Sequence, residues 1–400
     1  MTKLDKLIQE LCPNGVEFRK VKEVYQRIKG TPITAGKMKE IENPQGEIKI
    51  FAGGRTVINA KEEDIPNANI TRVPAVLVQS RGVIDAIYYD KPFTFKNEMW
   101  AYTADEPVSV KFLYYVLKNN MDYFRSTAAG MGSLPQISLP ATEDLVIPVP
   151  PLPVQREIVR ILDNFTELTA ELTAELTARK KQYEFYRDKL LTFDVLGRRT
   201  SKVVWRALGE VCDVVAGGTP SKKDTAYWEH GTIKWLGSTV CQNQKNIETV
   251  TAYITEKGLA ESSTKLMGKG TTLVALVGAT IGKVAFLPFE AAINQNIAGV
   301  YPKNIHELNP SYVYYACTLL YPKFLALTQG SKLAMANMSF VRSLKIPVPS
   351  LEVQNRIVFV LDNFNALCTD LSSGLPAEIE ARQKQYEYYR DKLLTFTPAD

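Results

Sequence analysis

The stretch IPVPPLPVQREIVRILDNF at 147–165 recurs as IPVPSLEVQNRIVFVLDNF at 346–364. A second stretch, ARKKQYEFYRDKLLTF at 178–193, recurs as ARQKQYEYYRDKLLTF at 381–396. The period of about 200 residues is too long for a stacked solenoid, whose repeats run to ~50 residues. The sequence therefore predicts two copies of one domain, each followed by a long helix.

Length and composition are typical of an ordinary protein of two to three domains. The 400 residues are 45% hydrophobic, and they contain neither a long apolar run nor a signal-peptide stretch, so we expect a cytoplasmic location. The five cysteines are scattered and form no CxxC pair, which favours buried thiols over a metal or redox site. The net charge of +5 is compatible with a polyanionic partner but does not require one.

The globular parts repeat at lower similarity. VEFRKVKEV (16–24) matches VVWRALGEV (203–211), KGTPI (29–33) matches GGTPS (217–221), and Asn97 falls on Asn294. Apolar β-rich runs such as PAVLVQ (74–79) alternate with Gly and Pro, which predicts strands and loops. We predict an α+β fold with two similar mixed α/β domains at 1–150 and 196–349, and long helices at 151–195 and 350–400.

The long helices carry apolar side chains at alternating steps of three and four residues, the heptad pattern of a coiled coil. This predicts an antiparallel pair with pseudo-twofold symmetry, in which ELTAELTAELTA (167–178) is a spacer that sets the length. Gly374 and Pro376 predict a kink, or a stop and restart, in the second helix. The alternative is that each helix packs only across its own domain. The central seam residues are Leu168, Leu172, Leu176, Leu367, Leu371 and Leu375.

Catalytic motifs are absent or incomplete. Only His230 and His306 occur, which leaves little material for a metal cluster or a histidine triad. GATIGKV (278–284) has one residue too few between its glycines for a phosphate loop, and Val284 replaces the required Ser or Thr. FAGG (51–54) and NPSY (309–312) are only superficially similar to methyltransferase motifs. We therefore predict that this chain catalyses nothing by itself.

Both globular parts contain polar and basic loops that could bind a polyanion. Gly lets a backbone approach a polyanion, Lys and Arg neutralise phosphate, and Asn, Gln and Arg read base edges. Ordinary polar turns are the alternative for any single loop, but two differing copies joined by long helices favour DNA. The candidate DNA-binding residues are Lys29, Thr31, Lys37, Arg81, Asn97, Ser133, Gln136, Thr219, Ser221, Lys222, Lys223, Ser238, Thr280, Asn294, Gln295, Ser331, Lys332 and Asn337.

The duplicated IPVP…LDNF and KQYE…LLTF segments, GGTPS and the ELTA block resemble the specificity subunit of type I restriction–modification systems. The resemblance covers essentially the whole chain. It implies two target recognition domains, each reading half of a bipartite asymmetric site in double-stranded DNA, and helices that set the half-site spacing. The first domain departs from the pattern, because it has KGTPI in place of GGTPS.

The resemblance also implies partners. Two modification (methyltransferase) subunits would dock on the helices, and restriction (translocase/nuclease) subunits would join the complex. S-adenosylmethionine and ATP with Mg would bind those partners, so we expect no cofactor and no metal on this chain.

Two other functions stay open at this point. One is a stand-alone methyltransferase or nuclease that uses FAGG and NPSY or an acidic cluster, and binding of S-adenosylmethionine by the isolated chain would reveal it. The other is a non-catalytic scaffold or decoy relative that lacks DNA specificity and holds two protein partners.

Overall fold

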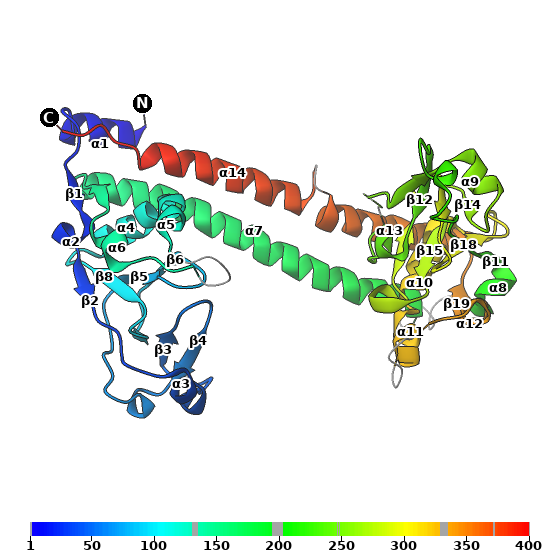
Figure 1. Ribbon diagram of the computed structural model, residues 1–400, viewed down its shortest axis with the longest axis horizontal. Coiled ribbons are helices and arrows are strands. Elements are labelled where there is room, and N and C mark those ends of the chain that lie inside the picture. Colours follow the sequence, from blue (N-terminus) through cyan, green and yellow to red (C-terminus); the bar gives the residue numbers. More distant parts are fainter. Residues whose placement is uncertain are drawn as a thin grey trace. The chain divides into compact units, whose positions relative to one another are not determined.

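The computed structural model describes residues 2–129, 135–193, 203–245, 247, 249–328, 335–370 and 373–399. Internal contacts divide the chain into two compact units, Met1–Thr173 with Glu378–Asp400, and Ala174–Ala377. Each unit combines a globular domain with segments of long helices (Figure 1). The candidates Ser133, Ser331, Lys332 and Leu371 lie outside the described residues.

The first unit contains short strands, short helices and parts of two long helices. Its elements are α1 (Lys3–Leu11), β1 (Phe18–Lys20), α2 (Val21–Val24), β2 (Gln26–Ile28), α3 (Ala35–Ile41), β3 (Ile48–Phe51), β4 (Val57–Ala60), η1 (Glu62–Asp64), β5 (Ala75–Gln79), β6 (Asp85–Tyr89), β7 (Phe93–Phe95), β8 (Trp100–Thr103), α4 (Pro107–Asn119), α5 (Met121–Thr127), α6 (Leu139–Glu143), β9 (Val146–Pro148), the start of α7 (Leu152–Thr192) and most of α14 (Leu375–Leu393).

The second unit has a similar order of elements, with differences in its short helices and one added strand. Its elements are the end of α7, β10 (Val204–Ala207), α8 (Leu208–Val211), β11 (Cys212–Ala216), η2 (Thr225–Tyr227), β12 (Ile233–Leu236), η3 (Ser238–Val240), β13 (Ala252–Ile254), α9 (Glu256–Ala260), β14 (Lys265–Met267), β15 (Thr272–Ala275), η4 (Gly278–Thr280), β16 (Val284–Phe286), β17 (Ala291–Ile293), β18 (Ile297–Pro302), α10 (Pro310–Thr318), α11 (Tyr321–Thr328), α12 (Met338–Ser343), β19 (Lys345–Val348) and α13 (Leu351–Thr369).

The sheets of the two units have equivalent topology. A four-stranded sheet has the order β2-β8-β5-β6 in the first unit and β11-β18-β15-β16 in the second. A second sheet contains one parallel pair, β3 with β7 or β12 with β17. A two-stranded sheet, β1-β9 or β10-β19, leads directly into α7 or α13. The predicted α+β fold and internal repeat are confirmed, and the extra strand β14 is a feature of the second unit.

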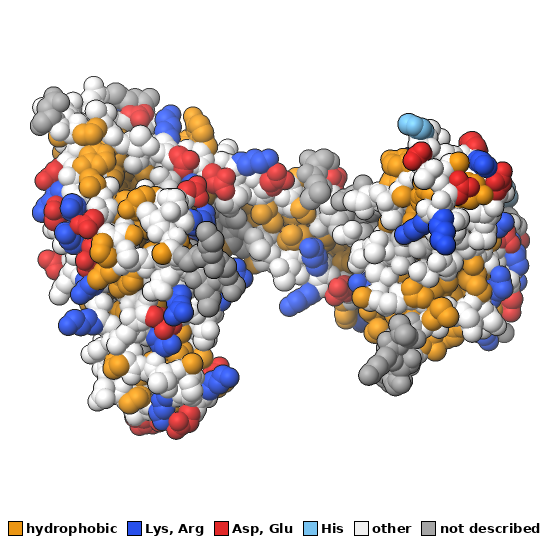
Figure 2. Space-filling model, viewed as in Figure 1, with side chains coloured by type: hydrophobic (Ala, Val, Ile, Leu, Met, Phe, Trp, Pro, Cys, Tyr) orange, Lys and Arg blue, Asp and Glu red, His pale blue; other side chains and the backbone are white. Residues whose placement is uncertain are grey.

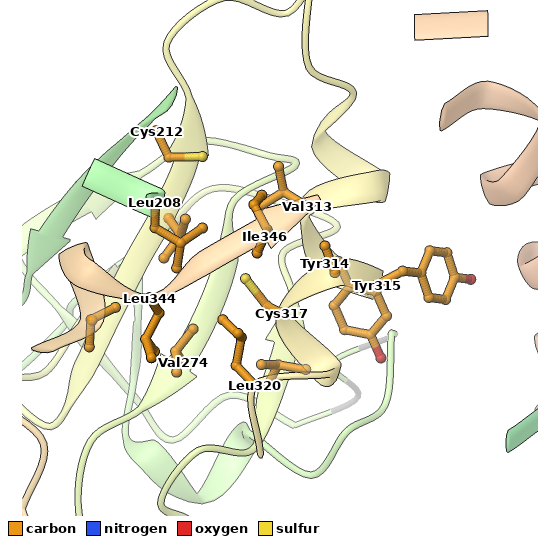
Figure 3. Packing of buried hydrophobic residues seen from close by; sticks show 14 of the residues in the cluster. Leu208, Cys212, Val274, Val313, Tyr314, Tyr315, Cys317, Leu320, Leu344 and Ile346 are labelled. Atoms are coloured by element: carbon orange, nitrogen blue, oxygen red, sulfur yellow. The ribbon is translucent and has the colours of Figure 1, made fainter. Parts of the chain in front are cut away.

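Each large core lies between the four-stranded sheet and the helices. In the second unit it includes Val274 from the sheet and Val313 and Cys317 from α10 (Figure 3). Ala298 of the sheet belongs to the same core. All five cysteines are buried and unpaired, as predicted. Burial raises the pKa of the Cys212 thiol to about 12, so the thiol stays protonated and behaves as a small apolar group.

The long helices pair within each unit as the heptad pattern predicts. In the first unit the Phe165 ring of α7 stacks on Tyr389 of α14, with centroids 5.6 Å apart. In the second unit Tyr186 of α7 lies 6.2 Å from Phe364 of α13. These residues occupy equivalent repeat positions, so the two contacts are copies of each other. The predicted stop and restart is confirmed, because α13 ends at Thr369 and α14 begins at Leu375.

The heptad pattern predicts helix pairing along the long helices, and the structure corrects this prediction for the helix ends that lie beside the globular domains. Val154 and Ile158 are buried in the core of the first globular domain, and Ile357 is buried in the core of the second. Apolar side chains near the C-terminal ends, Leu394 and Leu191, enter the same cores. The heptad pattern therefore serves two purposes, packing on the domain at the ends and pairing of helices between them. Central residues are less buried, and Leu168 and Leu367 are more than a third exposed.

A buried carboxylate joins α1 to α7. Glu157 is 4% exposed and accepts hydrogen bonds from Arg160 and Lys3. The bonds from Arg160, and then those from Lys3, outweigh burial and lower the pKa of Glu157 to about 2. Because a carboxyl with a lowered folded-state pKa stabilises the protein above its unfolded pKa of ~4.3, this contribution is lost as the pH falls from there towards 2.

We predict that Glu157→Gln weakens the loss of stability in acid. The thermal denaturation midpoint of the unchanged chain should fall more steeply between about pH 4 and pH 3 than that of the variant. Glu352→Gln is the control, since the pair between Glu352 and Arg356 is exposed on both sides. Parallel curves for Glu157→Gln and the unchanged chain would contradict the assignment.

Candidate nucleic-acid interface

In both units the candidate loops gather where the parallel strand pair ends. The loops after β3 and β7 contain Gly53 and Asn97, and those after β12 and β17 contain Ser238 and Gln295. Parallel strands end at the same edge of a sheet, so loops distant in sequence meet there. The loop after the first strand of the large sheet joins them, because Thr31 N donates to Phe95 O at 2.7 Å and Gly218 N donates to Ile293 O at 2.9 Å.

A glycine in each unit makes this close approach possible. A Cβ on Gly30 would lie 2.2 Å from Phe95 O, and a Cβ on Gly217 would lie 2.0 Å from Ile293 O. A side chain at either position would collide with the carbonyl that ends the parallel strand. The glycines therefore hold the two loops together, and Gly30 is the structural equivalent of Gly217.

This equivalence corrects two sequence matches by one residue each. KGTPI was matched to GGTPS with Gly30 on Gly218, whereas the structure places Gly30 on Gly217. Asn97 was matched to Asn294, but equivalent turns link Met99 N to Lys96 O and Ile297 N to Asn294 O. Asn97 therefore corresponds to Gln295, and both side chains are exposed. Sequence similarity missed the shift because the shared letters, GTP in one match and a single Asn in the other, align without it.

In the first unit, two candidates line one hollow. Lys29 and Asn97 lie around a cavity of ≈ 370 Å³ together with Arg27, Asn69 and Trp100, which are not among the candidates predicted from the sequence. Arg27 could have been predicted from the sequence, because it is a basic residue in the strand that ends at this loop. A basic, amide-rich and partly aromatic lining provides hydrogen-bond donors and acceptors suited to phosphate or base edges.

The candidates Arg81, Gln136 and Lys37 do not line this hollow. Arg81 and Gln136 are exposed and their backbones form an antiparallel bridge, so the structure brings these two together. Lys37 lies on α3 and pairs with Glu40 at 2.8 Å, which reduces its availability to phosphate.

Two candidate side chains are buried, which corrects the prediction that they bind DNA. Thr31 is completely buried, and its hydroxyl bonds Thr94 and accepts from Asn69 N at 2.9 Å. Asn294 is 8% exposed, and its side-chain oxygen accepts from Asn296 N at 3.0 Å. Both side chains shape the loops from within and present almost no surface to a ligand. Their polarity suggested binding, but polar side chains at loop bases are often used to bond the backbone.

In the second unit, Thr219 and Gln295 are joined by a hydrogen bond between their side chains. Next to them Ser221 is exposed, and its carbonyl accepts from the Trp228 indole at 3.1 Å. Lys222 and Lys223 follow and are exposed. This segment therefore presents two cations directly after two residues that are held by hydrogen bonds to Gln295 and Trp228.

The three remaining candidates of this unit lie near helical turns. Ser238 begins η3, and Thr280 ends η4 with its hydroxyl directed to Val277 O at 3.4 Å. Asn337 caps α12 by accepting from Phe340 N at 2.8 Å. Asn337 thus has a local structural role, although its side chain is exposed.

Neither a cluster of metal-binding side chains nor a helix suited to span a membrane occurs among the described residues. They contain no group of three His, Cys, Asp or Glu side chains that could hold a metal ion. None of their helices is both long and apolar enough to cross a membrane. On the face shown in Figure 2, basic and acidic side chains are interspersed over both globular domains. On this face, the described basic side chains therefore do not form one continuous surface.

Comparison with known proteins decides the family. Residues 13–179 and 200–381 both match the type I restriction modification DNA specificity domain. The chain belongs to this family. It is a type I specificity subunit that recognises DNA target sites within its complex, and specificity subunits are non-catalytic. The two matched segments are the two repeats that the sequence analysis identified.

Similar proteins cover most of the chain. The EcoR124I/EcoR124II type I restriction enzyme specificity subunit of Escherichia coli is 39% identical over 303 residues, 73% of this chain and 72% of that protein. A putative type I restriction enzyme specificity subunit of Haemophilus influenzae is 32% identical over 76% of this chain and 77% of its own length.

Solved structures show the same fold. The S subunit of the type I system from M. genitalium superimposes with a TM-score of 0.61 at 18% identity, covering 95% of this chain and 96% of that one. A chain from a study of assembly and conformational transition in the type I system gives 0.60 at 17% identity, covering 96% and 98%.

Proposed function

We propose that each globular domain of this specificity subunit reads one half of a bipartite, asymmetric site in double-stranded DNA. The observation that supports this most strongly is the contrast between the repeats. The helix segments are nearly identical, whereas the loops at the parallel strand ends differ, with Lys29 and Asn97 in one unit and Thr219, Lys222 and Gln295 in the other. Different loops on one scaffold suit different half-sites.

The proposed domain limits are 1–150 and 196–349 for recognition and 151–195 and 350–400 for the helices. The helices set the half-site spacing and dock two modification subunits, since equivalent helix contacts provide two equivalent places. Restriction subunits join the same complex. S-adenosylmethionine and ATP with Mg bind to those partner subunits, and the complex functions in the cytoplasm.

Selection of duplexes from a random pool tests this function. The chain, reconstituted with its modification subunits, should enrich two short fixed sequences separated by a gap of fixed length and variable composition. Enrichment of a single uninterrupted sequence would contradict two-domain reading. Recovery of no preferred sequence would favour the scaffold or decoy alternative.

Replacing both Lys222 and Lys223 by alanine should weaken DNA binding. The remaining affinity should also depend less steeply on the salt concentration. Each lost phosphate contact should reduce the slope of log K against log salt by ~0.9. Titration of the reconstituted complex with labelled duplex at several salt concentrations measures this. Lys269→Ala is the matched control, because Lys269 is exposed at the opposite end of β15 from the candidate loops. Unchanged slopes in the double variant would remove this loop from the interface.

A further inference from the structure

Each unit uses one repeated aspartate to connect a long helix to its globular domain. Asp163 of α7 and Asp362 of α13 belong to the two copies of the LDNF motif. In the first unit the Tyr115 hydroxyl of α4 donates to Asp163 Oδ1 at 2.5 Å. In the second unit the Tyr315 hydroxyl of α10 donates to Asp362 Oδ1. The same contact is thus made twice, between α4 and α7 in the first unit and between the equivalent helices α10 and α13 in the second.

The tyrosines are well placed to be donors. Tyr115 is 1% exposed and Tyr315 is fully buried, so both rings belong to the domain cores. Burial, and then the hydrogen bond to the aspartate, raises the pKa of each tyrosine well above its usual range, which keeps the hydroxyl protonated. Figure 3 shows the Tyr315 side chain extending away from the aliphatic part of its cluster.

A lysine completes each contact, but it comes from a different element. Lys111 lies one turn before Tyr115 on α4, and its Nζ is 2.8 Å from Asp163 Oδ2. Lys245 comes from the segment between η3 and β13 and pairs with Asp362 Oδ1. Lys245 is 12% exposed at its side chain and lies over the rings of Phe286 and Tyr315. The second contact therefore includes a residue from the part of the domain that differs between repeats.

These contacts are directional, whereas the apolar packing beside them is not. Val154, Ile158 and Leu162 of α7 pack on the first core through apolar side chains, and such packing is non-directional. A hydroxyl bonded to a carboxylate is short and about twice as strong as a neutral bond. Rotation of the domain about its helix would strain this bond, because the bond is directional.

We propose that the Tyr115–Asp163–Lys111 and Tyr315–Asp362–Lys245 clamps fix the angle between each recognition domain and its helix. This rests on the proposed function. Tyr115 and Tyr315 are then positioning residues for half-site spacing, although they touch no DNA. A rotated domain would carry its loops along the duplex, where one base-pair step is ~3.4 Å. Each clamp would thus restrict the complex to a single gap length.

Selection among duplexes that hold both half-sites at a series of gap lengths tests the proposal. Tyr115→Phe or Tyr315→Phe should lower the preference for the best gap over its neighbours about tenfold, the factor expected from one charge-assisted hydrogen bond. The bases preferred in each half-site should not change. A variant that keeps the original gap preference overturns the proposal.

Two matched variants control for loss of a buried hydroxyl. The Tyr25 hydroxyl donates to Ser109 O at 3.0 Å, and that of Tyr312 donates to Pro347 O at 2.9 Å, both inside a globular domain. Tyr25→Phe and Tyr312→Phe should keep the gap preference. Equal broadening in the controls would show that general loss of stability is responsible and would overturn the clamp.

A second measurement needs no DNA and separates this proposal from the proposed function. Spin labels at Lys61→Cys and Ala170→Cys, both exposed in the first unit, report the distance between domain and helix, and the native cysteines are buried. Tyr115→Phe should broaden the distance distribution, and Tyr25→Phe should not. An unchanged distribution overturns the clamp. If the unchanged complex selects no bipartite site, the proposed function fails, and this measurement alone decides the clamp.

Discussion

Deletion of one ELTA unit, Glu171–Ala174, should shorten the preferred gap between half-sites. The three ELTA units lie inside the continuous helix α7, so loss of four residues removes ~6 Å of rise and turns the following part by ~40°. Because one base-pair step is ~3.4 Å, the gap should fall by at least one base pair. Selection from the random pool with the reconstituted complex measures the change.

A length-matched variant separates the length of this segment from its sequence. Replacing Leu172 and Thr173 by alanine keeps the helix length and should leave the gap unchanged, with some loss of stability. If the deletion leaves the gap as it was, α7 does not set the spacing. If the alanine variant shifts the gap as far as the deletion does, side-chain packing and not length is the cause.

Gly217→Ala should abolish recognition of one half-site, and Gly30→Ala that of the other. The added Cβ would lie at most 2.2 Å from a strand-ending carbonyl oxygen, so the loop must move away. Overpacking of this kind costs ~1–3 kcal/mol, and a backbone atom as the obstacle places it at the upper end. We expect selection to retain one half-site and to lose the other.

Gly36→Ala and Gly268→Ala are matched controls for these glycine variants. A Cβ at either position would meet nothing within 4 Å, so both half-sites should be retained. Melting curves of all four variants would confirm that the proteins fold. Retention of both half-sites by a folded Gly217→Ala protein would contradict the placement of this loop at the interface.

The repeat made most of the fold predictable. Two copies of LDNF in the same context indicated equivalent helices, and Gly374 with Pro376 indicated the break that the structure has between Thr369 and Leu375. The register of the globular parts was harder, because short matches around Gly30 and Asn97 tolerate a shift of one residue. The backbone hydrogen bonds from these loops to the strand ends show the correct register, and they can be seen only in the structure.

The candidate site was only partly predictable for a related reason. Loop polarity indicated Lys29, Asn97 and Gln295, which are exposed, but also Thr31 and Asn294, which are buried. A polar side chain in a loop can serve the backbone or a ligand, and only its surroundings distinguish the two. The bond from Tyr115 to Asp163 joins residues of two different helices, so helical periodicity carries no sign of it.

The interruption after α13 has a consequence for how such a protein can change. If both long helices were rigid throughout, a longer α7 would need an equal insertion in its neighbour. The second helix is instead divided, since α13 ends at Thr369 and α14 begins at Leu375. The length of chain between two helices can change at a small entropic cost. One helix can therefore gain or lose a repeat by itself, so a new spacing can arise in a single mutational event.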